Sequence, residues 1–114
     1  MSRYLPGDVV LVSIALDGRG GAKVRPSVVV RSGSDGTIGI CPVSSQPPSD
    51  STSILLGIHD FAQGGLDLFS DSYVMTGRIL TIRNADVIGK RGRLLPEYLR
   101  AIVDETAQGK SRGR

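Results

Sequence analysis

The sequence is poor in the residues that most often cross-link or metallate a small protein. Its 114 residues include one cysteine, one histidine and no tryptophan. The single Cys41 excludes an intramolecular disulfide and a multi-cysteine metal site, and His59 with scattered acids gives no ligand spacing, so His59 is more simply a loop residue. Three tyrosines and two phenylalanines are few for a general stacking platform. We therefore expect no metal and no other cofactor.

Long apolar runs and an excess of charge on the folded part are also missing. No run approaches the ~20 residues of a membrane span, and the amino terminus carries no apolar signal segment. This predicts a cytoplasmic protein without a membrane partner. Three of the 14 basic residues follow Gly109, and without them 11 basic residues face 11 acidic ones. Bulk charge therefore does not predict a nucleic-acid ligand.

One stretch is nevertheless locally basic. Between residues 78 and 93, Asp86 is the only acid among five basic residues, which are Arg78, Arg83, Lys90, Arg91 and Arg93. A stripe of this kind suits contacts to phosphates. An ordinary solvated loop explains the same charges equally well.

Short apolar runs separated by Gly, Pro, Ser and Asp predict a sheet of several antiparallel strands. We expect strands over residues 8–14, 27–32, 37–43 and 51–57, and a fifth over 72–83 with a bend at Gly77. The turn at residues 32–36 makes the second and third strands a hairpin. Residues 46–53 and 59–70 are loops by composition, and either can form a flap over a site.

A helix is predicted over residues 96–108. Pro96 and Glu97 suit its first turn, and Gly109 suits its C-terminal cap. Leu99, Ile102 and Val103 recur at helical spacing, so this stripe is expected in the core or in a dimer interface. The length fits one domain over residues 1–109, followed by a basic flexible tail at 110–114.

Polar groups stand at the ends of two predicted strands. Arg25 precedes Pro26 before the second strand, and Ser44 and Ser45 follow the third. The ordered segments are PGDVVLV at 6–12, a glycine-rich turn at 18–21, RPSVVV at 25–30 and PVSSQ at 42–46. In this order the chain resembles the MazF/PemK family of toxin endoribonucleases. The similarity extends more weakly through residues 80–82 and 92–94 into the last helix.

The resemblance implies a mainly β fold with a C-terminal helix, a compact SH3-like twisted β-barrel of the type shared by MazF and CcdB, assembled as a homodimer. It implies a type II toxin that cleaves single-stranded mRNA without a metal. The 2′-hydroxyl of the RNA would attack, leaving a 2′,3′-cyclic phosphate. The implied partner is a cognate antitoxin peptide, together with which the toxin would bind DNA.

The resemblance also assigns site residues. Arg25 would hold the scissile phosphate with its planar fork of donors. Because a serine hydroxyl is a poor general base, Ser44 would donate to the phosphate or orient the attacking hydroxyl. RNA-binding roles are expected for Lys23, Ser45, Gln46, Arg78 and Arg83. From the residues alone, a surface arginine and a hydrogen-bonded turn at the two serines explain the same motifs.

One part of the family pattern is absent. Some members carry an Arg and an Asp just before the strand that contains Thr-Ile, and alignment on Thr81 and Ile82 puts Met75 and Gly77 at those positions. Cleavage would then depend on Arg25 and Ser44. Two alternatives are a non-catalytic, gyrase-directed toxin like CcdB on the same fold, and a small β-barrel that binds nucleic acid without chemistry.

Overall fold

The computed structural model describes residues 4–15, 21–33, 35–45, 52–64 and 72–112, the last six by their backbone alone. Its elements in chain order are β1 (Asp8–Ile14), β2 (Lys23–Ser32), β3 (Thr37–Ser44), β4 (Ile54–Leu56), the 3-10 turn η1 (Ile58–Asp60), β5 (Phe61–Gly64), β6 (Ser72–Val74), β7 (Leu80–Arg83), the 3-10 turn η2 (Asn84–Asp86), β8 (Val87–Leu94) and the helix α1 (Pro96–Arg112). The predicted fold class, mainly β with a C-terminal helix, is confirmed.

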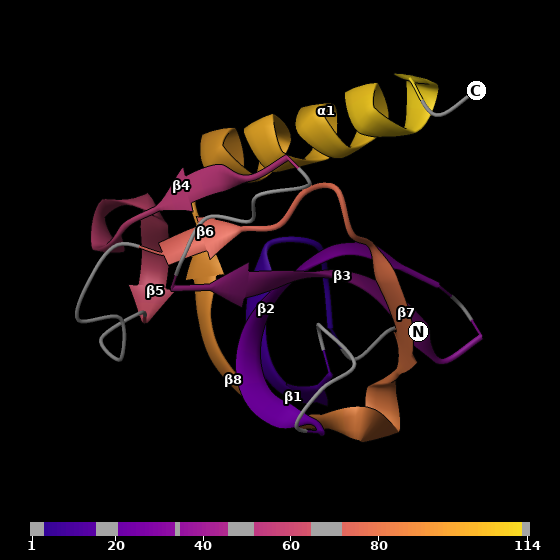
Figure 1. The fold of residues 1–114 in the computed structure, drawn as a ribbon. Coiled ribbons are helices and arrows are strands. Elements are labelled where there is room, and N and C mark those ends of the chain that lie inside the picture. Colours follow the sequence, from indigo (N-terminus) through magenta and orange to yellow (C-terminus); the bar gives the residue numbers. More distant parts are fainter. Residues whose placement is uncertain (1–3, 16–20, 34, 46–51, 65–71, 113–114) are drawn as a thin grey trace.

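The strands form one antiparallel sheet that curls into a half-barrel (Figure 1). The strand order is β4-β6-β3-β2-β1-β8-β5, and β7 pairs with the first half of β3. Register shifts interrupt the pairing of β1 with β8 and of β2 with β3. Such irregularities bend and twist a sheet, which helps this one to curl. The helix α1 lies outside the curl, above β4 and β6 in this view.

The curl separates two apolar cores, because successive residues of a strand point to opposite faces. One core lies between the sheet and α1 and includes Val9, Val28 and Ile102. The other lies inside the curl and includes Val10 and Val29. Both faces are therefore covered where β1 and the middle of β2 pass between the cores, which explains the apolar runs Val9–Val12 and Val28–Val30.

The helix begins at Pro96 as predicted but continues through Gly109 to Arg112, so the predicted cap at Gly109 is wrong. Ile102 is fully buried, whereas Val103 is 38% exposed, so Val103 is not in the core of the single chain. The Tyr98 hydroxyl donates to the Leu55 carbonyl of β4 and fastens α1 to the sheet. No helix in the described part of the chain is long and apolar enough to span a membrane.

Several predicted strand boundaries are wrong. The second strand starts earlier, at Lys23, and the stretch from 72 to 83 is two strands, β6 and β7, separated by a turn at residues 76–77. β5 lies inside the predicted 59–70 loop. Gly64 indicates a loop in the sequence, but in the structure it permits β5 to approach the backbone of β8 closely. It has φ +72°, and a Cβ on it would lie 2.3 Å from the Arg91 carbonyl oxygen of β8. β8, which is not among the predicted strands, contains three of the five cations of the basic stripe, Lys90, Arg91 and Arg93.

A buried carboxylate fixes the start of β1 to β8. Asp8 is 2% exposed, and its Oδ1 lies 2.7 Å from Nη1 of Arg93 and 3.2 Å from Nζ of Lys90. Its Oδ2 accepts from the Leu5 amide at 3.0 Å. The preceding Gly7 has φ +100°, which a side chain would strain. The Gly-Asp pair therefore builds the fold, and two cations of the stripe are bound to it.

Candidate functional site

Arg25 and Ser44 lie near the ends of the neighbouring strands β2 and β3, just beyond the last residues that pair. Ser27 of β2 lies opposite Pro42 of β3. The pairing of the two strands ends there, and Arg25 and Ser44 each lie two residues beyond that last pair; Arg25 itself lies opposite Val12 of β1. Because successive residues of a strand alternate between its two faces, Arg25 and Ser44 are on the side of Ser27 and Pro42. The guanidinium and the hydroxyl therefore stand on one face, where β2 begins and β3 ends.

Arg25 is half-buried, and its Nε is shielded from solvent without a hydrogen-bond partner in the described part of the chain. Its backbone is extended, as expected before Pro26. Lys23, two residues earlier and thus on the same face, is exposed. Buried donors are rarely left unpaired. This face therefore offers two cations to an anionic ligand, while the shielded Nε–H of Arg25 is left for a partner inside the protein.

Ser44 is the half-buried last residue of β3 and pairs with Tyr73 of β6. Ser45 follows it in an exposed bend. Two predicted hydroxyls are thus adjacent at the strand end. Gln46, the next predicted RNA-binding residue, lies outside the described residues.

Two residues missed at the sequence level extend this line of side chains. Tyr73 lies opposite both Ser44 and Leu55 of β4. Their neighbours Val43 and Val74 belong to the core under the helix, so Ser44, Tyr73 and Leu55 face the other way. Tyr73 is half-buried and Leu55 is 51% exposed. We call Arg25, Ser44, Tyr73 and Leu55 the rim row. The alternation of side chains in β6 shows which face Tyr73 is on, but Tyr73 can be placed beside Ser44 only when the pairing of β6 with β3 is known.

The turn after β6 occupies the place where the family pattern has its Arg and Asp. Met75 is 5% exposed, and its amide donates to the Pro42 carbonyl at 2.8 Å, so the turn is fastened to β3. Thr76 is buried and its hydroxyl lies 2.9 Å from that of Thr52. Arg78 follows, half-buried, with its amide donating to the Met75 carbonyl at 3.3 Å. The turn thus carries Arg78 but no carboxylate, and it lies beside the middle of β3, between the pairs Val43–Val74 and Ile40–Leu80.

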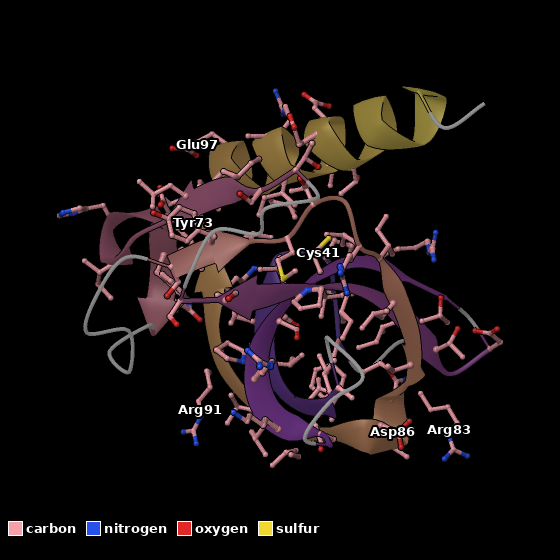
Figure 2. The ribbon with its side chains drawn as sticks, viewed as in Figure 1. Cys41, Tyr73, Arg83, Asp86, Arg91 and Glu97 are labelled. Atoms are coloured by element: carbon pink, nitrogen blue, oxygen red, sulfur yellow. The ribbon has the colours of Figure 1, made fainter. Side chains whose placement is uncertain are left out.

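The rest of the predicted basic stripe lies elsewhere. Arg83 pairs with Thr37, at the other end of β3, and its Nε lies 3.5 Å from Oδ2 of Asp86. Figure 2 shows Arg83 and Asp86 together at the far side of the molecule from Tyr73. Lys90 and Arg93 contact Asp8. The structure therefore does not bring Arg83 into the rim row, and the stripe is not a continuous phosphate track.

Other polar groups do not join the rim row. A pocket of about 330 Å³ lies at the far end of β2 and β3, lined by Arg31, Asp35, Thr37 and Thr81 among others. The Thr37 hydroxyl and amide hold the pKa of Asp35 below its usual value. His59 is exposed in η1. Within the described ranges, no three His, Cys, Asp or Glu side chains gather as metal ligands would.

Comparisons with known proteins agree with this architecture. Residues 5–108 match the family described as the PemK-like, MazF-like toxin of type II toxin-antitoxin system. No curated protein matches the sequence. The toxin MazF-mt6 of Mycobacterium tuberculosis has a similar structure, with a TM-score of 0.64 and 16% identity over 90% of this chain and 96% of its own. An endoribonuclease in complex with its cognate antitoxin from a mycobacterial species has a TM-score of 0.68 and 17% identity over 97% of this chain and 96% of its own.

At such low identity the two solved structures establish the fold, whereas the family match covers residues 5–108 and so nearly the whole sequence. The chain therefore belongs to the PemK-like, MazF-like toxins of type II toxin–antitoxin systems, a family of endoribonucleases.

Proposed function

We propose that this toxin cleaves single-stranded mRNA, with a preference for certain sequences, at the rim row and without a metal. One observation carries the proposal. The half-buried Arg25, whose Nε lacks a partner in the described part of the chain, is on the same face as Ser44 at the neighbouring strand end, and Ser44 lies in line with Tyr73 and Leu55. Charge, hydroxyl and apolar surface are the three features that a phosphate, a ribose and a base require.

In the proposed reaction the 2′-hydroxyl oxygen bonds to the adjacent phosphorus while the bond from phosphorus to the 5′ oxygen breaks. The products are a 2′,3′-cyclic phosphate and a 5′-hydroxyl; the 2′-hydroxyl proton leaves to solvent and the departing oxygen gains one. Arg25 neutralises the charge that builds on the phosphoryl oxygens. Ser44 donates to the phosphate or orients the attacking hydroxyl, since its own pKa makes it a poor base.

The neighbouring residues supply binding. Lys23, Ser45 and Arg78 contact the RNA backbone around the cleaved bond, while a base rests on Tyr73 and Leu55. The role of Gln46 stays a prediction, as does that of Arg83, which lies at the far end of β3. Sequence preference would come mostly from which base fits against Tyr73 and Leu55.

We extend the proposal to the assembly. The toxin acts in the cytoplasm as a homodimer, and a cognate antitoxin peptide blocks its RNA site and joins it on DNA. The similar structure in complex with its cognate antitoxin supports such a partner. Ile58 and Val103 are 42% and 38% exposed in the single chain, and a partner chain would cover apolar side chains of this kind.

The test is incubation of the purified protein with single-stranded RNA in EDTA. We expect cleavage, and we expect a 2′-deoxy substitution at the cut position to stop it. A reaction that requires Mg²⁺, or that proceeds on the deoxy substrate, would contradict the mechanism. Absence of RNA cleavage under all conditions would instead favour a non-catalytic toxin on this fold.

A further inference from the structure

Ser27 is a polar residue in an apolar place. It is 0% exposed, and its hydroxyl has no hydrogen-bond partner within the described ranges. Its cross-strand neighbours are Val10 of β1 and Pro42 of β3, neither of which has a polar side chain. A buried hydroxyl without a partner is unfavourable, and an alanine of nearly the same size would avoid the cost. The serine is therefore not explained by packing.

Arg25 is the polar residue nearest to Ser27 along the same face of β2. Residues two apart in a strand point to the same side and lie about 6.6 Å apart. The Arg25 Nε is likewise shielded and unpartnered in the described part of the chain. Nε–H is a donor and a hydroxyl oxygen is an acceptor, so the two orphaned groups are complementary. The two groups are not bonded to each other in this structure, so a side-chain rotation or a bridging water would have to join them.

We propose that Ser27 is a positioning residue for Arg25, a role that rests on the proposed function of Arg25 in phosphate binding. By accepting from Nε–H, the hydroxyl fixes the plane of the guanidinium and directs its two terminal nitrogens toward the strand end, where Ser44 stands. A fork held in one orientation stabilises the transition state without reorganising. The PSVVV segment after Arg25 thus has a role in the site as well as in the core.

The first test is Ser27→Ala, followed by the NMR signal of the Arg25 Nε–H and by cleavage kinetics. We expect faster exchange of that proton with water. We also expect kcat to fall roughly five- to tenfold, the rate equivalent of one hydrogen bond, with a smaller change in KM. Because the substitution removes one oxygen from a fully buried site, the melting temperature should hold or rise. Ser72→Ala is the matched control, since Ser72 is also buried but lies opposite Leu56 of the core under the helix.

A second variant shows whether Ser27 acts through Arg25. In the Arg25→Lys background the side chain has no Nε, so Ser27→Ala should have no further effect on kcat. The proposal is overturned if the Nε–H exchange rate is the same with and without the Ser27 hydroxyl, or if kcat falls equally in the Lys background. If the protein cleaves no RNA, the exchange rate still decides the contact between the two side chains, and only the proposed function fails.

Discussion

The two ends of β1 and β2 hold cations in opposite ways. Where β1 begins, Lys90 and Arg93 converge on Asp8, a carboxylate that is 2% exposed. Where β2 begins, Arg25 has its Nε shielded but without a partner in the described part of the chain. The first arrangement pairs both cations with one carboxylate of the fold. The second leaves a buried Nε–H donor that a neighbouring hydroxyl can satisfy, and the rest of the guanidinium is left for an external phosphate.

This difference teaches that a count of basic residues does not locate a binding surface. The stretch from Arg78 to Arg93 is rich in cations, yet carboxylates contact Arg83, Lys90 and Arg93. Buried ion pairs need both partners, and loss of one leaves a desolvated charge. We therefore expect substitutions at the Asp8 end to lower stability and substitutions at the Arg25 end to lower activity.

The largest expected effect is that of Arg25→Ala on cleavage. Loss of one donor to the transition-state charge should lower kcat by about 10² to 10³, while the melting temperature stays nearly constant. Arg25→Lys should recover part of the rate, because it restores charge but not the planar fork. Arg31→Ala is the matched control, since Arg31 is an exposed arginine on the same strand, bonded to Thr81 at the far end. Equal rates for Arg25→Ala and wild type would place the site elsewhere.

Asp8→Asn is the counterpart at the other end. The amide keeps the shape but removes the charge that holds Arg93 and Lys90, so we expect a loss of roughly 2 kcal/mol in the free energy of unfolding, as for hydrogen bonds to charged groups. Urea denaturation measures this loss. Cleavage by the folded fraction should be unchanged. A stable variant with slow cleavage would show that Asp8 serves the site.

The strand β1 and two residues of the candidate site could be predicted from the sequence. The strand from Asp8 to Ile14 has the predicted bounds, because its apolar residues are bracketed by turn and loop signals. Motif order singles out Arg25 and Ser44, and the hairpin that joins their strands brings both residues to the same end of β2 and β3. That neighbourhood is a consequence of local pairing, which sequence patterns describe well.

What could not be predicted depends on distant pairing. β8 is a half-exposed strand with few apolar residues, and it becomes a strand because β1 and β5 flank it. Tyr73 joins the rim row only through the pairing of β6 with β3, across 28 intervening residues of sequence. The roles of Asp8 with Lys90 and Arg93 likewise require contacts between the two ends of the chain. The helix α1 continues beyond its predicted end at residue 108, because a glycine such as Gly109 can also occupy a position inside a helix.

A smaller effect on stability is expected from Cys41, in the core between the sheet and α1. Burial raises the pKa of the Cys41 thiol to about 12, from an ordinary value of 9.0. The unfolded chain therefore loses this proton at lower pH than the folded chain does, so stability should fall as pH rises above 9. We expect a loss of roughly 1 kcal/mol between pH 8.5 and pH 10. Urea titrations of wild type and Cys41→Ala test it: the variant should show a shallower decline, and equal declines would mean that the thiol is hydrated.

The smallest expected effect is that of Arg83→Ala, and it sharpens the contrast between the two ends of β3. Arg83 is 76% exposed and pairs with Asp86 over 3.5 Å, so its removal should change the free energy of unfolding by less than about 1 kcal/mol. Its place beside Thr37 is remote from Ser44 along β3, so RNA affinity should keep its dependence on salt.

Arg78→Ala should instead make the slope of log affinity against log salt concentration shallower by about 0.7, as one lost phosphate contact does for single strands. We expect this because the turn that contains Arg78 is fastened to Pro42, close to Ser44 in β3. Filter binding across a salt series compares the two variants. A flatter slope for Arg83→Ala than for Arg78→Ala would mean that RNA follows β7 and not the rim row.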